Sequence, residues 1–292
     1  MSKMHGTAAK ASERLLAAGP GPLEYGRRLW LKALFALIFI LLYAPIVTLI
    51  AFSFNTDKRN VVWRGFTLGN YAKAWENAAL IEAFTNSLVI AMIATVISTI
   101  IGAMAALLMW RFRFPGKPAY EGFLALPIVI PEICMGISLL MFFAYLGLWD
   151  SVVKLPWPLN LSTIVIAHVA FCFPFVAVVV RARMAGFNRQ LEEASKDLGA
   201  SEWQTFRHVV FPFMQPGLIA GALLAFTLSL DDFVITFFTS GPETVTFPVK
   251  VYSLVRRGVS PEINAASTAL IVITVVATVI AMKLQAPARQ VR

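Results

Sequence analysis

Residues 193–212 read EASKDLGASEWQTFRHVVFP, and the residue types in this stretch predict two short helices. It lies within a segment, 181–216, that separates two long apolar stretches. Connections between packed helices usually take about two to eight residues, so a segment of this length has structure of its own. Gly199 is placed to end one short helix, and Ser201 followed by Gln204 predicts the capping box that opens a second one.

Both predicted helices are amphipathic. On the first, an apolar or small face opposes a charged face: Leu191, Ala194, Ser195 and Leu198 against Glu192, Glu193, Lys196 and Asp197. The second presents an apolar side made of Trp203, Phe206, Val210 and Phe211. We expect Pro212 to end this helix and Pro216 to open the next span. A compact knob of this kind suits insertion into a partner's groove. The alternative, a helix lying on the membrane, favours Lys and Arg on the polar face, where this helix carries mostly acids.

The composition places the rest of the chain in a membrane. Hydrophobic residues make up 58% of the 292 residues and charged residues 14%, whereas soluble domains carry about 25% charged residues. Six apolar stretches are long enough to cross a hydrocarbon core of about 30 Å: 30–54, 86–110, 123–148, 162–180, 217–238 and 264–283. The sequence therefore predicts an all-α polytopic membrane protein with six transmembrane helices.

Lys and Arg residues predict the orientation of these helices. The two ends and the segments 111–122 and 181–216 hold seventeen of them, and the alternate segments hold eight. Positive charge stays on the cytoplasmic side, so we expect both termini and the 187–212 loop to be cytoplasmic. The net charge of +9 then reflects loops beside anionic lipid rather than nucleic-acid binding. The expected domains are a tail (1–29), a transmembrane domain (30–283) and a second tail (284–292).

The segments expected outside the membrane also contain helix signals. Residues 248–257 begin with a proline and end with two arginines before Gly258, which predicts a short helix. A second short helix is expected near residues 70–75.

Three carboxylates, Glu132, Asp231 and Asp232, fall inside apolar stretches. Each costs about 2.5–3.5 kcal/mol at the centre of a membrane helix, so such groups face a bundle interior or a water-filled path. A substrate path for a cation is one reading, and pairing between helices or a shallow solvated position is the other.

Helical spacing distinguishes the two aspartates. Asp232 falls in a polar stripe with Ser229, Thr236 and Thr239, so we expect Asp232 to line the path. Asp231 lies on a more apolar side and is expected to pair with a neighbour or to cap a loop.

Glu132 follows Pro131, and Pro127 lies one turn earlier. Two prolines at this spacing remove backbone donors and predict a broken helix within the membrane. A broken helix beside a carboxylate suits an amine with several donors; the alternative is a kink that only serves packing.

The loop resembles a known signature. Glu193-Ala194-Ser195, Gly199 and Val209-Val210-Phe211-Pro212 match the EAA motif of inner-membrane permeases of bacterial ATP-binding-cassette (ABC) importers: Glu-Ala-Ala, three residues, Gly, nine residues, Ile-x-Leu-Pro. Ser195, Val209 and Phe211 are mild departures from it. The resemblance implies a type I importer permease fold. It also implies that these residues, with Leu198, form coupling helices in a cleft of a separate ATPase. The chain itself has no phosphate-binding GxxxxGK[ST] loop, and no enzyme activity, cofactor or metal site is expected.

Two further segments resemble the second permease of spermidine/putrescine systems: 126–140, LPIVIPEICMGISLL, and 229–232, SLDD, which is followed by 240–242, SGP, and 258–265, GVSPEINA. This implies polyamine transport across a bacterial inner membrane by alternating access. Ser229 and Thr236 would line the path with the three carboxylates. The implied partners are a homologous permease, two ATP-binding subunits and a periplasmic binding protein. Another amine-containing solute is the first alternative, and an ion-coupled secondary carrier is the second.

Overall fold

A computed structural model describes residues 29–57, 62–148, 159–256, 258 and 260–284. The expected tails and the segment 149–158 fall outside these described residues, apart from residues 29 and 284. The chain divides into two compact units, Met1–Phe52 and Ser53–Arg292. Within the described parts the elements are helices, and the β-bridge between Asn55 and Phe66 is an isolated pair that belongs to no strand. This agrees with the all-α prediction.

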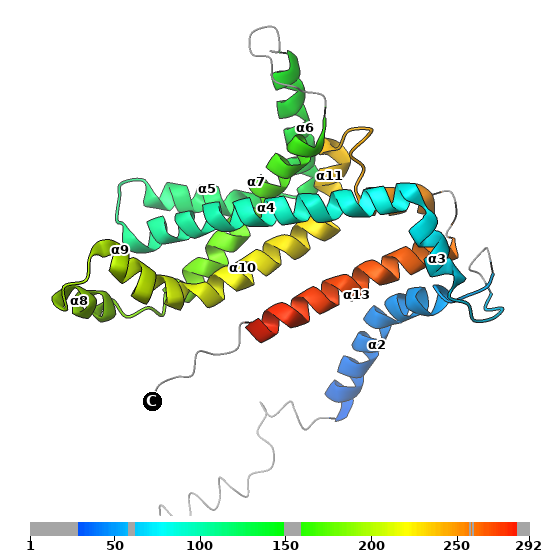
Figure 1. Ribbon diagram of the computed structural model, residues 1–292, viewed down its shortest axis with the longest axis horizontal. Coiled ribbons are helices and arrows are strands. Elements are labelled where there is room, and N and C mark those ends of the chain that lie inside the picture. The colour runs from blue at the N-terminus through cyan, green and yellow to red at the C-terminus, as the bar shows by residue number, and fades with distance from the viewer. Residues whose placement is uncertain (1–28, 58–61, 149–158, 257, 259, 285–292) are drawn as a thin grey trace, which may run out of the picture. The chain divides into compact units, whose positions relative to one another are not determined.

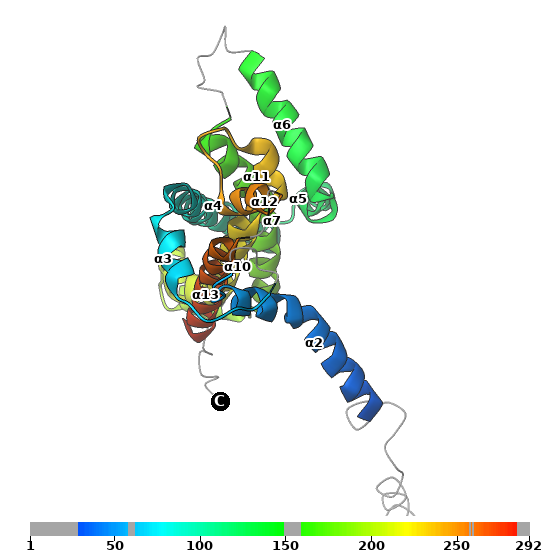
Figure 2. The same ribbon diagram turned by 90° about the vertical axis from the view of Figure 1, so that its right-hand side faces the viewer.

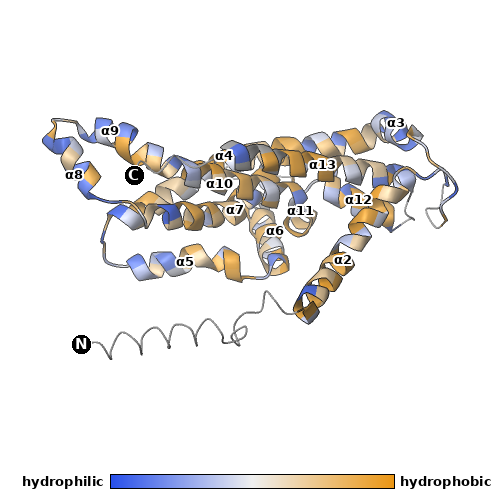
Figure 3. Ribbon diagram, turned by 90° about the horizontal axis from the view of Figure 1, so that it is seen from below, coloured by the Kyte–Doolittle hydropathy of each residue, from blue (hydrophilic) through white to orange (hydrophobic). Residues whose placement is uncertain are grey.

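The first unit contributes α2, Leu29–Phe52, which matches the first apolar stretch. Its 24 residues span about 36 Å at 1.5 Å per residue, enough to cross a bilayer core. None of these 24 residues is buried by protein, and Figure 3 shows the helix as almost entirely apolar. A helix that is apolar on all sides requires lipid or another apolar surface around it.

The core of the second unit is formed by α4, Ala78–Arg111, α7, Leu161–Met184, and α10, Phe211–Asp231, which lie side by side (Figures 1 and 2). The helices approach closely around Val176 of α7. A Cβ atom added to Gly102 of α4 would lie 2.7 Å from Val176 Cβ, and one added to Gly221 of α10 would lie 3.0 Å from Val176 Cγ1. Small residues allow membrane helices to pack at such short range.

The third apolar stretch is broken, as the two prolines predict. It forms α5, Lys117–Val129, and α6, Glu132–Leu148, which meet at an angle of 105°. Ile130 is extended, with ψ 133°, because a residue before proline is pushed out of the helical region. The break falls at Pro131, while Pro127 stays inside α5. The expectation that 111–122 is a loop is wrong in part, since α5 begins at Lys117.

The remaining helices are α3, Gly69–Glu76, α12, Phe247–Val255, and α13, Pro261–Leu284. The first two confirm the short helices expected near 70–75 and 248–257. By length and composition, α2, α4, α7 and the run Glu202–Asp231 could each cross a membrane, and the α5–α6 pair could form a fifth span. The apolar part of α13, 261–276, is shorter. All six apolar stretches are therefore helical.

Candidate functional site

The fifth apolar stretch is not one continuous helix, which corrects the expectation for 217–238. The helix α10 ends at Asp231, and α11 runs from Val234 to Thr239. Between them Asp232 is extended, with ψ 124°. Its carboxylate accepts hydrogen bonds from the backbone N–H groups of Ile235, at 3.3 Å, and Thr236, at 2.8 Å. Asp232 therefore caps α11 by satisfying two amide groups that a helix start leaves without acceptors.

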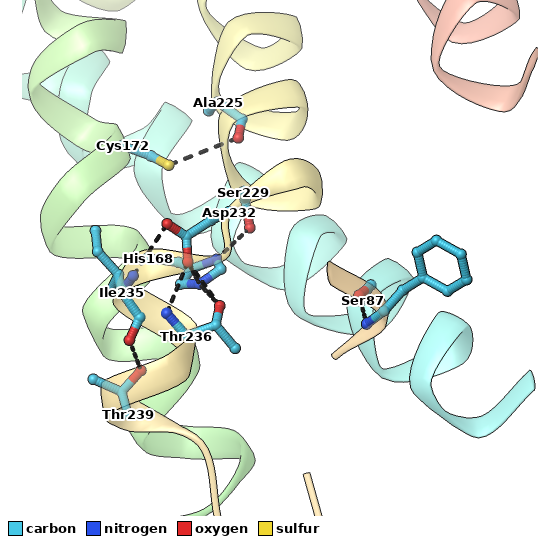
Figure 4. A network of polar contacts seen from close by, with 10 residues as sticks. Ser87, His168, Cys172, Ala225, Ser229, Asp232, Ile235, Thr236 and Thr239 are labelled. Atoms are coloured by element: carbon cyan, nitrogen blue, oxygen red, sulfur yellow. Dashed lines mark hydrogen bonds and ion pairs between the residues drawn. The ribbon is translucent and has the colours of Figure 1, made fainter. Parts of the chain in front are cut away.

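The side chain of His168, on α7, lies between the two halves of this broken helix (Figure 4). Its Nδ1 is 2.7 Å from Ser229 Oγ in the last turns of α10. Its Nε2 is 2.9 Å from Thr236 Oγ1 of α11 and 3.4 Å from Asp232 Oδ2. All four residues are buried, His168 with 1% of its surface exposed. One imidazole thus connects α7, α10 and α11.

The hydrogen bonds of this cluster form a continuous chain. Thr236 donates its hydroxyl hydrogen to Asp232 Oδ2 at 2.7 Å, and its oxygen lies within hydrogen-bond distance of His168 Nε2. The tautomer of the ring determines which atom donates in the bond between Nδ1 and the Ser229 hydroxyl. The chain leads from Ser229 through His168 and Thr236 to the carboxylate of Asp232. Because every member has a partner, the cluster can be buried without the cost of an unpaired polar group.

Asp231 and Glu132 lie in a different environment from Asp232. Asp231 is the last residue of α10 and Glu132 is the first residue of α6, and both are exposed. Glu132 begins α6, which packs against α11, and Asp231 ends the helix that precedes α11, although 99 positions separate them in the chain. Exposed carboxylates at the ends of broken helices can bind a solute that carries positive charge.

In the structure Asp232 caps α11 and lies 3.4 Å from His168 Nε2, whereas helical spacing predicts the capping or pairing role for Asp231. Helical spacing treats 229–239 as one continuous helix, but α10 ends at Asp231. The expectation that Asp232 lines a substrate path stays a prediction. The stripe residues Ser229, Asp232 and Thr236 do lie together, on the side that faces α7.

Two residues of these sites were missed by the sequence analysis. His168 was not singled out, although an ionisable residue inside an apolar stretch is by itself a signal of function. Arg111 stands at the end of α4 and gave no signal, because its partners lie 81 and 91 positions away.

The 187–212 loop begins with the two short helices that its sequence predicts. The first is α8, Gln190–Asp197, and Gly199 follows it with φ +85°. The amides of Gly199 and Ala200 bond to the carbonyls of Lys196 and Ser195, a Schellman ending. The second, α9, Glu202–Thr205, has the expected capping box between Ser201 and Gln204.

The end of this second helix differs from the expectation. Pro212 does not stop it: α9 passes through a π-helical turn, Phe206–Val210, directly into α10. The Phe211 amide reaches back to the Phe206 carbonyl. Pro212 therefore lies inside one helical run, Glu202–Asp231, and the π-helical turn directly before it accommodates a residue that has no N–H to donate.

The residues of the expected charged face of α8 do not all face solvent. Glu193 and Asp197 are exposed, but the side chain of Glu192 is buried. Its Oε2 accepts a bond of 2.8 Å from Arg111 at the end of α4. The helical pattern alone could not place Glu192 inward, because Arg111 comes from a distant part of the chain.

Further contacts attach the loop to the helix bundle. Arg111 also reaches Glu202 at 3.5 Å, and Arg189 donates to the Trp110 carbonyl at 3.0 Å. Lys196 bonds to Glu202 and holds the pKa of that exposed carboxyl below its usual value. A groove of about 680 Å³ runs alongside, lined by Arg111, Glu192 and apolar residues of α4 and the π-turn. The loop and the end of α4 are thus joined by ion pairs.

The outer surface of the loop is apolar in part. Leu198 is 89% exposed, Trp203 67% and Leu191 52%. Five residues of the EAA-like motif are also exposed: Glu193, Ala194, Gly199, Phe211 and Pro212. Ser195 and Val209 are half-buried. Large apolar side chains that stay exposed are typical of an interaction site.

Comparison with known proteins places these features in context. The family model "Binding-protein-dependent transport system inner membrane component" matches residues 98–286. The chain is 40% identical to the spermidine/putrescine transport system permease protein PotC of Escherichia coli strain K12, over 82% of this chain and 87% of that protein. It is also 40% identical to the putrescine transport system permease protein PotI of the same organism, over 83% and 85%.

Solved structures share the fold. A chain of a bacterial ABC transporter that imports the acidic polysaccharide alginate superposes with a TM-score of 0.71 at 17% identity, covering 90% of this chain and 96% of that one. A chain of the MetNI methionine ABC transporter gives a TM-score of 0.58 at 17% identity, covering 70% and 94%. At this level of identity the likeness extends to the fold alone.

Proposed function

Since the chain belongs to the family of binding-protein-dependent transport system inner membrane components, we propose that it is the permease of an ATP-driven importer of polyamines such as putrescine or spermidine. Members of this family are transport subunits, so the chain is a permease and not an enzyme. Its membership also removes the ion-coupled secondary carrier as an alternative. An importer of another amine-containing solute remains the competing proposal.

The observation that carries the polyamine proposal is the placement of Glu132 at the start of α6 and of Asp231 at the end of α10, both exposed at helix breaks. Two exposed carboxylates at such breaks suit a substrate with at least two ammonium groups. We assign direct contact with the substrate to these two residues. Asp232, Ser229 and Thr236 stand behind Asp231, where they support the same wall of the path.

The 187–212 loop is the proposed docking site for the ATPase. Its exposed Leu198 and Trp203 would enter a groove of that subunit, and its ion pairs to Arg111 would pass the motion to α4. The complete importer would comprise this chain, a homologous permease, two ATP-binding subunits and a periplasmic binding protein. Both termini and the loop would face the cytoplasm, as the distribution of Lys and Arg predicts.

Uptake of labelled putrescine and spermidine by a strain that lacks this gene tests the substrate. We expect uptake to be lost and to return with the wild-type gene. Glu132→Gln and Asp231→Asn should each raise the KM for uptake several-fold at equal amounts of protein in the membrane. Normal polyamine uptake in the deletion strain, checked after removal of any redundant importer, would reject the polyamine proposal.

A further inference from the structure

The break between α10 and α11 needs an outside support. A helix that stops within an apolar environment leaves carbonyl groups of one half and amide groups of the other without partners. Asp232 satisfies two amides of α11, but it belongs to the broken segment and cannot fix the angle of one half against the other. The group that does so must come from a neighbouring helix and contact both halves.

His168 meets this requirement. It stands on α7, which contacts both α10 and α11. Its two ring nitrogens bind one residue from each side of the break, Ser229 of α10 and Thr236 of α11. In Figure 4 the ring lies between the two ribbons, with dashed lines to both halves. Because the imidazole is rigid and planar, both contacts are kept only at one separation of the two halves.

The position of Asp231 depends on this arrangement. Asp231 lies two residues after Ser229 and directly before Asp232, and both of these neighbours are held in the buried cluster. The backbone of Asp231 is therefore fixed from both sides. Its side chain is exposed, whereas those of Ser229 and Asp232 are buried, and Glu132 begins α6, which packs against α11. Any shift of α10 against α11 would change the separation of these two carboxylates.

We propose that His168 is a positioning residue that fixes the break between α10 and α11 and thereby sets the spacing of Asp231 and Glu132, which selects among amines of different length. The proposal rests on the polyamine function proposed above. His168 itself does not contact the substrate, since it is buried behind the broken helix. Its replacement should therefore change the relative KM values for short and long amines and not merely the amount of active transporter.

The test uses His168→Leu, which removes both hydrogen bonds, and His168→Gln, which keeps a donor and an acceptor. Each variant replaces the chromosomal copy in the source bacterium. KM values are measured for putrescine, cadaverine and spermidine, with the amount of the chain in the membrane determined by immunoblot. We expect His168→Leu to change the KM ratio of putrescine to spermidine at least threefold and His168→Gln to restore part of the wild-type ratio.

Val176→Ala is the matched control. Val176 lies about two turns from His168 on the same helix and is also buried, and it packs against Gly102 of α4 and Gly221 of α10. It should change the amount of transporter and leave the KM ratio as in the wild type. A His168→Leu ratio equal to that of wild type would overturn the proposal. If that variant is absent from the membrane, the His168→Asn and Ser229→Ala ratios decide in the same way. A wild-type strain that imports no polyamine would instead refute the proposed function.

Discussion

Arg111 Nη1 lies 2.8 Å from Glu192 Oε2 and joins the last turn of α4 to the first turn of α8. The glutamate side chain is 11% exposed and the arginine 39%. The other glutamate oxygen, Oε1, is buried and has no hydrogen-bond partner among the described residues. Without Arg111, both oxygens of the mostly buried Glu192 carboxylate would therefore lack a partner among the described residues.

Arg111→Met should destabilise the protein for this reason. Loss of one partner of a fully buried pair costs about 3–5 kcal/mol, and the partial exposure of Arg111 reduces the expected cost to about 1–2 kcal/mol. Thermal unfolding of the purified transporter in detergent would measure it. Arg113→Met is the control, since Arg113 is exposed and makes no ion pair within the described residues. Equal unfolding temperatures for the two variants would contradict this account.

Gly199→Ala should impair transport through the loop. Gly199 has φ +85°, where a side chain costs about 1–2 kcal/mol. Gly116, which precedes α5, offers a matched control with φ +87°, and a Cβ at either glycine meets no atom within 4 Å. The two substitutions therefore add similar strain. We expect Gly199→Ala to lower uptake and the yield of co-purified ATPase more than Gly116→Ala does. The same loss in both variants would assign the effect to strain alone.

Gly102→Ala should destabilise the three-helix core. The added Cβ would lie 2.7 Å from both the Phe173 carbonyl oxygen and Val176 Cβ, and overpacking of this kind costs about 1–3 kcal/mol. Gly122→Ala, in α5, is the control because its added Cβ meets no atom within 4 Å. Thermal unfolding should separate the two variants by several degrees. A Gly102→Ala protein as stable as Gly122→Ala would show that α4 and α7 are farther apart.

Asp232→Ala should mainly lower the stability of the protein, and Asp231→Ala should mainly lower uptake. Removal of Asp232 leaves two α11 amides and the Thr236 hydroxyl without their acceptor, at a cost of about 2–3 kcal/mol. Removal of the exposed Asp231 should change stability by less than about 0.5 kcal/mol and still reduce uptake. The unfolding temperature and the rate of polyamine uptake are measured for each variant. A stable Asp232→Ala protein would show that the α11 cap is not required.

Most of the helices can be predicted from the sequence. Apolar length identified the helices because each must span or face lipid, and this signal needs no knowledge of neighbours. The capping box of Ser201 and the helix stop at Gly199 were also readable, since both are made by residues a few positions apart. The loop motif identified the family for the same reason: its spacing lies within one continuous segment.

The contacts between distant side chains depend on how the helices pack. His168 joins Ser229 and Thr236 across 61 and 68 positions, and Arg111 finds Glu192 across 81. Helical periodicity treats 229–239 as one helix and cannot reveal that α10 ends at Asp231, so it does not predict that Asp232 caps α11. A cap is local, but the histidine that supports it lies on another helix. Only the packing of α7 against α10 and α11 places Asp232 inside and leaves Asp231 exposed.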